Sequence, residues 1–221
     1  MLTLITQRDI CDKKLGGTDM LEHSYVEYYE KMGLDLIPVP NGVGNIGRYF
    51  DLNPSLVILS GGNDISPSLY GGKYLSNSLS SWERDMLERR LVDYAVERQV
   101  PILGECRGMQ FLNVYFGGKV LQNVGREGHV AKTHEIEIVV GRIFGKNNPV
   151  VNSYHNHCIS EKELSSELKV FAKSSEGFVE GVYHSSLPIM GMMWHPERKG
   201  CAEGLNEKLI ANFLDFREFY F

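Results

Sequence analysis

Cys106 has the surroundings best suited to nucleophilic chemistry. It lies in the run ILGECRGMQ (residues 102–110), between an apolar, strand-like stretch (100–103) and a helical pattern. Gly104 and Gly108 stand two residues before and after it, as a sharp strand-to-helix turn requires, because larger side chains would collide with neighbouring backbone. Such a turn strains the nucleophile and places it at a helix N-terminus, which favours the thiolate. The segment therefore predicts a nucleophile elbow that carries cysteine.

A thiolate nucleophile needs a base, and the base needs a group that orients it. His195 follows an apolar strand (189–194), so it should emerge at the strand's end, where active sites of open α/β folds gather. Glu197 comes two residues later, across a proline that stiffens the turn, and can reach the other imidazole nitrogen. These two residues are the predicted base and orienting acid.

Acyl transfer also needs hydrogen-bond donors for the developing oxyanion. The run SGGND (60–64) follows another buried strand, and its glycines allow backbone amides to face a ligand. We expect the N–H groups of Gly62 and Arg107 to form the oxyanion hole.

The elements that position these residues alternate in the first half of the chain. Strands are predicted at 2–6, 36–39, 55–59 and 100–103, and amphipathic helices at 18–32 and 82–96. The inward faces of the two helices are predicted from apolar residues that recur every 3.6 residues, the period of an α-helix. They are Leu21, Tyr25, Tyr28, Tyr29 and Met32 in the first, and Trp82, Met86, Leu87, Leu91, Tyr94 and Ala95 in the second.

The second half changes character: strands are predicted at 133–140, 168–172, 179–184 and 189–194, followed by a last helix around 205–214. These patterns predict an α/β fold of flavodoxin-like type. It has an open, mostly parallel central sheet, helices on both faces and appended antiparallel strands. No linker or repeat interrupts the sequence, so residues 1–221 are interpreted as one domain.

Composition restricts the function classes. With 43% hydrophobic residues the chain can bury a sizeable core, and its net charge of −5 gives no basic surface for nucleic acid or an anionic membrane. The first residues resemble a strand rather than a signal peptide, and no apolar stretch reaches membrane-spanning length. The four cysteines (11, 106, 158 and 201) are scattered without disulfide or metal-ligand spacing, and we expect a reducing cytoplasm. Homodimer formation is left open.

Taken in order, the motifs resemble the class I glutamine amidotransferase family and, within it, the γ-glutamyl-hydrolase-like branch. The resemblance covers most of the chain. It rests on GGND (61–64) with Pro67 and Tyr70, Arg84-Asp85 with Glu88, G-x-CRG-x-Q-x-x-N (104–113), Gly117-Gly118 with Leu121-Gln122, VNSYH (151–155) and HPE (195–197).

The resemblance implies a Cys106–His195–Glu197 triad that cleaves a γ-glutamyl amide through a thioester. It places the glutamyl amino-acid end near Gln110 and the segment Ser153-Tyr154-His155. It implies a small-molecule substrate, with no cofactor and no metal.

Two positions depart from the branch pattern, and both flank the expected substrate pocket. His157 and Met193 stand where relatives carry glutamine. The leaving group therefore cannot be transferred from polyamine-type or folate-type relatives. Among individual members, the chain resembles the hydrolases that act on γ-glutamyl-CDP-amidate in capsule phosphoramidate biosynthesis, although no motif identifies a cytidine nucleotide.

Each motif also has a plainer interpretation. Cys106 alone could be a small buried hydrophobe, His195 a structural histidine and Gly61-Gly62 a tight turn. Residues 42–47 (GVGNIG) fit the dinucleotide fingerprint, but prolines precede them and no long amphipathic helix follows, so we interpret them as a loop. His155 and His157 lack a third metal ligand with suitable spacing. Asp64, Arg84 and Glu88 could form solvated ion pairs or line the pocket.

Three functions compete at this stage. A stand-alone thiol amidohydrolase fits the complete triad and the long loop from Asp64 to Ser80. A glutaminase subunit would instead deliver ammonia to a separate synthase and depend on that partner. A non-catalytic flavodoxin-like binding module would leave Cys106 unreactive toward glutamine-mimicking electrophiles.

Overall fold

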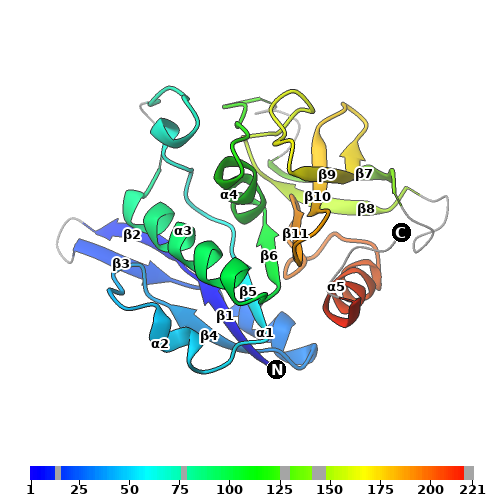
Figure 1. Cartoon of the computed structure of the whole chain (residues 1–221). Helices are drawn as coiled ribbons and strands as arrows, with labels where there is room; N and C mark the ends of the chain where they lie inside the picture. Colours follow the sequence, from blue (N-terminus) through cyan, green and yellow to red (C-terminus); the bar gives the residue numbers. More distant parts are fainter. Residues whose placement is uncertain (13–15, 76–78, 125–129, 141–147, 217–221) are drawn as a thin grey trace.

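The central element of the fold is a nine-stranded sheet with the order β4-β1-β5-β6-β11-β10-β9-β7-β8 (Figure 1). The computed structural model describes residues 1–12, 16–75, 79–124, 130–140 and 148–216. The parallel strands are β4 (Asp35–Val39), β1 (Leu2–Thr6), β5 (Leu56–Leu59), β6 (Ile102–Glu105) and β11 (Ile189–Met192). The antiparallel strands are β10 (Val179–His184), β9 (Leu168–Ser174), β7 (Val130–Ile138) and β8 (Val150–Tyr154).

Helices cover both faces of this sheet. One face carries α2 (Gly47–Phe50), α3 (Trp82–Glu97) and α4 (Arg107–Tyr115), and the other carries α1 (His23–Lys31) and α5 (Leu205–Phe216). Successive strand residues point to opposite faces, so Leu4 packs with the first group and Ile5 with the second. The predicted flavodoxin-like α/β architecture with appended antiparallel strands is confirmed.

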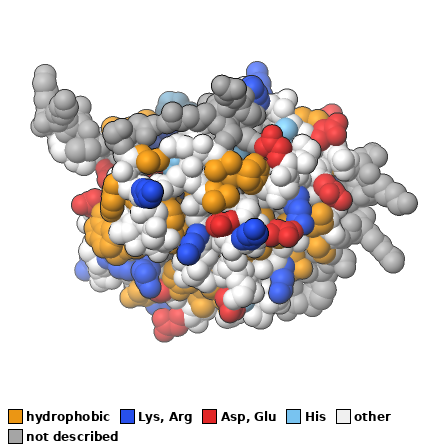
Figure 2. Space-filling model, turned by 90° about the horizontal axis from the view of Figure 1, so that it is seen from above, with side chains coloured by type: hydrophobic (Ala, Val, Ile, Leu, Met, Phe, Trp, Pro, Cys, Tyr) orange, Lys and Arg blue, Asp and Glu red, His pale blue; other side chains and the backbone are white. Residues whose placement is uncertain are grey.

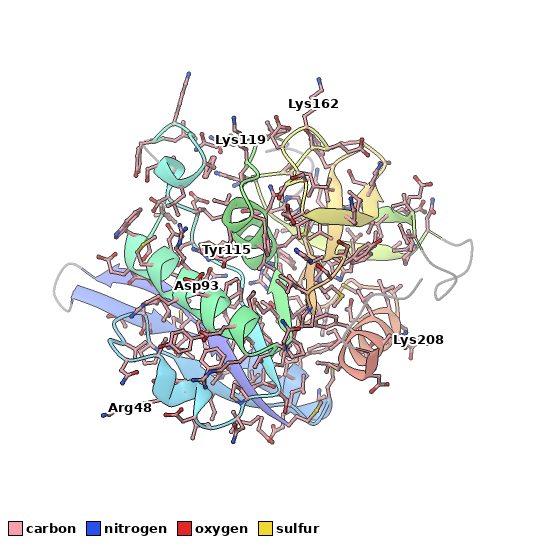
Figure 3. The ribbon with its side chains drawn as sticks, viewed as in Figure 1. Arg48, Asp93, Tyr115, Lys119, Lys162 and Lys208 are labelled. Atoms are coloured by element: carbon pink, nitrogen blue, oxygen red, sulfur yellow. The ribbon has the colours of Figure 1, made fainter. Side chains whose placement is uncertain are left out.

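Two helices on the first face, α3 and α4, are joined by a side-chain hydrogen bond. Figure 3 shows Tyr115 of α4 and Asp93 of α3 close together, and the Tyr115 hydroxyl donates a hydrogen bond of 2.7 Å to Asp93 Oδ1. Helix α4, which begins directly after Cys106, is therefore held in place by α3 as well as by the sheet.

The helix predicted at 18–32 is wrong over its first part. Residues Gly16–Met20 form β3, which pairs antiparallel with β2 (Arg8–Asp12), and α1 begins only at His23. Residues 18–20 are held in this strand by their pairing with residues 8–10, and Gly16, the first residue of β3, has φ +80°, a conformation that favours glycine. The hairpin extends from the carboxyl end of β1, beside the turn after β5, since Asn63 Nδ2 donates to Asp9 O at 2.7 Å.

Three further expectations need adjustment. Strand β6 begins at Ile102 rather than at Val100 and continues to Glu105, and β8 is a strand that the sequence pattern did not predict. Trp82 was expected to face inward but is 51% exposed. The buried positions of α3 instead include the charged residues Arg84, Asp85 and Glu88, which form ion pairs.

Arg84, Asp85, Glu88 and Arg107 form a buried cluster of alternating charge. Arg84 Nε lies 2.9 Å from Glu88 Oε1, and the Arg107 guanidinium pairs with both Asp85 and Glu88. Arg84 also donates to Ser60 O at 2.6 Å. Burial opposes the charge of Glu88, but Arg107 and Arg84 hold its pKa below the usual value. Neither Arg84 nor Glu88 is solvated, and the cluster joins α3 to the turn after β5 and to the start of α4.

In the described part of the chain, no helix combines the length and the apolar character that crossing a membrane requires.

The buried cluster predicts a large stability effect for Glu88→Gln. This change leaves the buried guanidinium of Arg84 without its carboxylate partner and Arg107 with Asp85 alone. The loss should lower the free energy of unfolding by about 3–5 kcal/mol. Chemical denaturation measures the difference. The control is Glu83→Gln on the exposed first turn of the same helix, which should stay within about 0.5 kcal/mol of the unsubstituted protein. Equal effects of the two substitutions would contradict this prediction.

Candidate active site

Cys106 occupies a sharp turn between β6 and α4. Its φ is +50° and its ψ is −102°, a region that non-glycine residues rarely adopt and that costs about 1–3 kcal/mol. Its N–H donates to Met192 O at 2.8 Å, which ties the turn to the end of β11. Cys106 is buried and stands at the N-terminus of α4, as the sequence predicted for a nucleophile elbow.

The two flanking glycines are required by close packing. A Cβ on Gly108 would overlap the Leu59 carbonyl group of β5, lying 2.7 Å from its carbon, and a Cβ on Gly104 would lie 2.7 Å from the Gly108 carbonyl carbon. Real Cβ atoms do not approach backbone this closely, so any side chain would push α4 away from β5 and β6. The predicted collision with neighbouring backbone is confirmed.

His195 and Glu197 lie in the segment that follows β11. The His195 ring is buried, and its Nδ1 lies 2.8 Å from Glu197 Oε1. Asn152 of β8 holds the His195 backbone from both sides: its Oδ1 accepts from His195 N at 2.9 Å, and its Nδ2 donates to His195 O at 2.7 Å. The sequence motif at 151–155 suggests substrate contacts, whereas Asn152 positions the histidine.

Cys106 and His195 lie close enough for the thiol to influence the charge of the imidazole ring. Burial by itself would lower the pKa of His195, but the neighbouring Cys106 and Glu197 raise it to about 10. A histidine with this pKa is protonated at neutral pH and can act as a proton donor. The structure thus brings the three predicted triad residues together in the order Cys106, His195, Glu197.

The turn after β5 lies directly against the histidine. A Cβ on Gly61 would come within 2.5 Å of His195 Cε1, so the backbone approaches the ring as closely as glycine permits. Gly62 follows with φ +127°, which again favours glycine. Arg107 is the first residue of α4, where an N–H group has no acceptor within the helix. Both predicted oxyanion donors therefore lie on backbone segments that adjoin Cys106 or His195.

The four predicted substrate-binding residues divide into two groups. Tyr154 is partly exposed, and its ring meets the His195 ring edge-on with centroids 5.6 Å apart. Gln110 is buried, and its Nε2 donates to His157 O at 3.0 Å. Ser153 is fully buried, and His155 faces Glu180, with its Nε2 3.9 Å from Oε1. Tyr154 is thus placed beside the triad, whereas the other three lie among internal partners.

The two positions that depart from the branch pattern are also located. Met193 is fully buried, and its sulfur lies 3.6 Å from Gln110 Nε2. His157 Nε2 lies 4.0 Å from Asp64 Oδ1 of the loop after β5, and burial lowers the pKa of His157 although Asp64 opposes this shift. His155 and His157 therefore face different acids, which argues against a shared metal ion.

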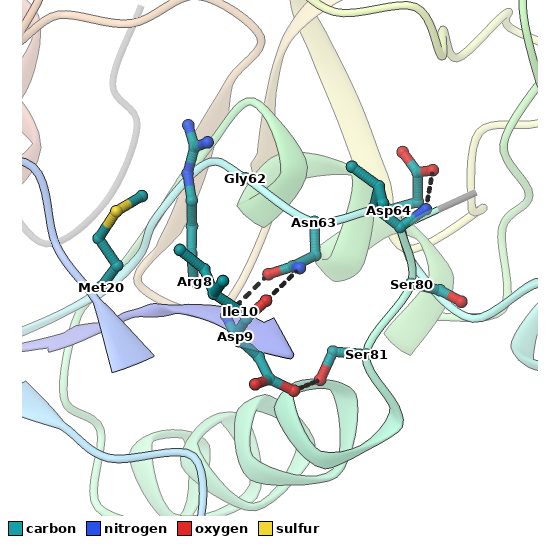
Figure 4. A pocket seen from close by; sticks show the side chains of 10 residues that line it. Arg8, Asp9, Ile10, Met20, Gly62, Asn63, Asp64, Ser80 and Ser81 are labelled. Carbon is teal, nitrogen blue, oxygen red and sulfur yellow. Dashed lines mark hydrogen bonds between the residues drawn. The ribbon is translucent and has the colours of Figure 1, made fainter. Parts of the chain in front are cut away.

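A cavity of about 520 Å³ opens beside Gly62 (Figure 4). Its walls come from the β2–β3 hairpin and from the loop that starts at Gly62, and they combine an arginine, two carboxylates, hydroxyl groups and apolar side chains. The lining residues are Arg8, Asp9, Ile10, Met20, Gly62, Asn63, Asp64, Leu79, Ser80 and Ser81. The hairpin that sequence patterns missed therefore contributes one wall of a cavity that shares Gly62 with the predicted oxyanion hole.

Sequence reasoning also missed Glu105. Among the described residues, the side chains of Glu105, His195 and Glu197 meet, with one polar atom of each within 4.8 Å of the other two. All three side chains are buried, and His195 Nδ1 is already engaged by Glu197. The only signal in the sequence was an acid at the end of an otherwise apolar strand.

Cysteines other than Cys106 have different environments. Burial raises the pKa of Cys158 to about 12, and burial also raises that of Cys201, so neither is a thiolate at neutral pH. The side chain of Cys11 lies outside the described part of the chain. On the face of the molecule seen in Figure 2, basic and acidic side chains are interspersed over the described surface.

Comparison with known proteins identifies relatives over most of the chain. The family described as Peptidase C26 matches residues 10–197. A glutamine amidotransferase-like protein, YvdE of Lactococcus lactis, is 32% identical over 87% of this chain and 86% of its own. The γ-glutamyl-CDP-amidate hydrolase of Campylobacter jejuni is 30% identical over 91% of each chain.

A solved structure with the same fold is that of a Thermoplasma acidophilum protein described as belonging to a GMP synthase. It has a TM-score of 0.69 and 21% identity, and the match covers 98% of this chain and 94% of that one.

The packing around the elbow predicts that Gly108→Ala is poorly tolerated. The added methyl group meets the Leu59 carbonyl, and the resulting shift of α4 should cost about 1–3 kcal/mol and displace Cys106. Thermal unfolding and the rate of Cys106 alkylation by iodoacetamide measure the two effects. The control is Gly42→Ala, where nothing lies within 4 Å of the new Cβ, and stability should be unchanged or slightly increased. Unchanged stability and alkylation in the Gly108 variant would refute the packing argument.

Proposed function

The chain belongs to the peptidase C26 family and is a hydrolase of amide bonds, and we propose that it cleaves a γ-glutamyl amide through a γ-glutamyl thioester on Cys106. The observation that carries this proposal is the buried array of Cys106, His195 and Glu197 at the carboxyl ends of β6 and β11. This arrangement supplies a nucleophile, an acid–base group and an orienting carboxylate.

The first half-reaction forms the thioester. The Cys106 thiolate attacks the γ-carbonyl carbon, and the negative charge that develops on the carbonyl oxygen is stabilised by the N–H groups of Gly62 and Arg107. When this tetrahedral intermediate collapses, His195 donates its Nε2 proton to the leaving nitrogen and the C–N bond breaks. The products of this step are the free amine and the acyl-enzyme.

The second half-reaction releases glutamate. Neutral His195 accepts a proton from a water molecule, whose oxygen attacks the thioester carbonyl carbon. Collapse breaks the C–S bond, so the thiolate leaves while His195 keeps the proton, and the initial thiolate–imidazolium pair is restored. Glu197 stabilises the imidazolium in both halves and fixes the ring through its Nδ1 contact.

We assign the glutamyl amino-acid end of the substrate to the side of the site formed by Gln110 and residues 153–155. Tyr154, which contacts the His195 ring edge-on, is the member of this set best placed to touch the substrate. Ser153 and His155 support it from the interior.

The leaving group is assigned to the cavity beside Gly62. A volume of about 520 Å³ lies in the range typical of small-molecule sites and exceeds what ammonia requires. This size favours a bulky leaving group over glutamine hydrolysis for a synthase partner. Arg8 provides a cation on the cavity wall, which suits a phosphate-bearing amine such as the cytidine nucleotide of γ-glutamyl-CDP-amidate.

The first test is Cys106→Ala. Without the thiol no acyl-enzyme can form, so glutamate release should fall by about three orders of magnitude or more. Circular dichroism and thermal unfolding should show that the fold persists. Undiminished turnover in a folded variant would exclude the thioester mechanism.

The second test is a substrate panel on the purified chain alone. Glutamine, γ-glutamyl polyamines and γ-glutamyl-CDP-amidate are compared by kcat/KM for glutamate release. We expect the nucleotide phosphoramidate to be the best substrate of the three. Glutamine turnover that appears only when a synthase is added would instead support the role of a glutaminase that serves a partner, and failure of Cys106 to react with a glutamine-mimicking electrophile would support a binding module.

The pH dependence follows from the environment of His195. Its pKa is raised to about 10, so the imidazolium needed to protonate the leaving amine is present at neutral pH and is lost as pH rises through that value. We expect kcat/KM to fall on the alkaline side near pH 10 rather than near 6.5, as measured by initial rates in constant-ionic-strength buffers. An alkaline decrease that begins near neutrality would contradict this environment for His195.

A further inference from the structure

Glu105, the residue before the nucleophile, has no role in the mechanism described above. Its side chain is fully buried. On one side it meets α1, where the Tyr29 hydroxyl donates to Glu105 Oε1 and the Tyr25 hydroxyl also interacts with the carboxyl group. Tyr25 in turn accepts the N–H of Gly61 at 3.0 Å. The carboxyl group of Glu105 is thus linked to the turn that carries the proposed oxyanion donor.

On its other side Glu105 meets the orienting acid. One of its carboxylate oxygens lies within 4.8 Å of a carboxylate oxygen of Glu197 and of a ring nitrogen of His195. Glu197 Oε1 is engaged by His195 Nδ1 at 2.8 Å and by Arg198 Nε at 3.3 Å. In contrast, Oε2 of Glu105 and Oε2 of Glu197 are both buried and have no hydrogen-bond partner among the described residues.

Two neighbouring buried carboxyl groups cannot both be ionised, because each anion raises the pKa of the other. Glu197 contacts two cationic groups, His195 and Arg198, so it keeps the negative charge. Glu105 meets only hydroxyl groups on its other side. Burial, followed by the charge of Glu197, raises the pKa of Glu105 well above its usual range, although Tyr29, His195 and Tyr25 oppose the shift.

The tyrosines are consistent with this assignment. Burial and the nearby carboxylates raise the pKa of Tyr25 and of Tyr29, so both hydroxyls remain protonated and act as donors. A neutral carboxylic acid has one O–H to donate, and the partnerless Oε2 of Glu197 is an acceptor in need of a donor. One proton between the two Oε2 atoms would satisfy both.

We propose that Glu105 is a positioning residue that remains protonated and donates a hydrogen bond from Oε2 to Glu197 Oε2, which fixes the orienting carboxylate and limits how strongly it raises the basicity of His195. The expected effect on kcat rests on the proposed function. The protonation of Glu105 and its hydrogen bond to Glu197 do not. The titratable and charged groups near the pair include Tyr25, Tyr28 and Tyr29 of α1, and His195, Arg198 and Cys201 of the segment after β11. Cys106 is the next residue in the chain.

The test compares Glu105→Gln with Glu105→Leu. The glutamine amide is neutral and can donate to Glu197 as the protonated acid does, so kcat should stay within about threefold of the unsubstituted enzyme. Leucine cannot donate, and the loss of orientation of Glu197 should lower kcat by about 10-fold to 100-fold with little change in KM.

Two further readouts need no substrate. The infrared spectrum at neutral pH should contain the carbonyl stretch of a buried protonated carboxylic acid, and Glu105→Gln should remove it. In protein labelled with ¹⁵N-histidine, the titration of His195 should be unchanged in Glu105→Gln. It should move up by about one pH unit in Glu105→Leu, because the charge of Glu197 is then no longer shared with a donor. The exposed Glu167→Gln is the matched control and should change neither readout.

Distinct results would overturn the proposal. Loss of activity in Glu105→Gln equal to that in Glu105→Leu would mean that a charged carboxylate is needed. A role in folding alone would lower thermal stability and leave kcat and the His195 titration unchanged. A divalent metal retained by the purified protein would replace the shared proton. If no γ-glutamyl amide is hydrolysed, the proposed function fails, whereas the infrared band and the histidine titration still decide the state of Glu105.

Discussion

The rest of the site depends on the close contact between the N-terminus of α4 and the end of β5. Gly108 packs on the Leu59 carbonyl so tightly that no Cβ fits between them. This contact fixes where α4 begins, and the chain can connect β6 to that point only if Cys106 adopts φ +50°. The strain of about 1–3 kcal/mol is offset by packing on both sides of the turn. A nucleophile held in this way has lost its conformational freedom before any substrate binds.

The buried cluster of alternating charge also fixes the turn that carries Cys106. Arg107, the residue after the nucleophile, pairs with Asp85 and Glu88 of α3, and Arg84 of that helix donates to Ser60 O. Helix α3 therefore sets the distance between the nucleophile turn and the turn that carries Gly62. An ion cluster of this kind contributes little net stability, but its directional contacts permit only one arrangement of the two turns. It suits a site whose function requires two backbone segments to be held in register.

What could be predicted from the sequence was local, and what could not depends on distant segments. The glycines around Cys106 and the proline between His195 and Glu197 act over two residues, so their consequences could be inferred directly. The region 18–20 pairs with 8–10 across the hairpin, which helical periodicity cannot detect. A hydrophobic pattern predicts that Trp82 is buried, and it cannot predict the burial of Arg84. Such a pattern ignores ion pairs between charged residues of different helices. Asn152 resembles an ordinary strand residue until β8 is known to lie against the His195 backbone.

The two acids near His195 show why residue type alone does not define a role. Glu197 and Glu105 carry the same functional group, yet Glu197 faces an imidazole and a guanidinium whereas Glu105 faces two tyrosine hydroxyls. Two separate segments supply these neighbours, α1 and the turn after β11, while Glu105 itself ends β6. Burial among hydroxyl groups raises the pKa of Glu105, whereas Glu197 pairs with two cations, and this difference assigns Glu197 as the charged partner and Glu105 as the neutral donor. Since the Tyr25 hydroxyl also accepts the N–H of Gly61, the same buried group connects the orienting acid with the proposed oxyanion hole, and both depend on the position of α1.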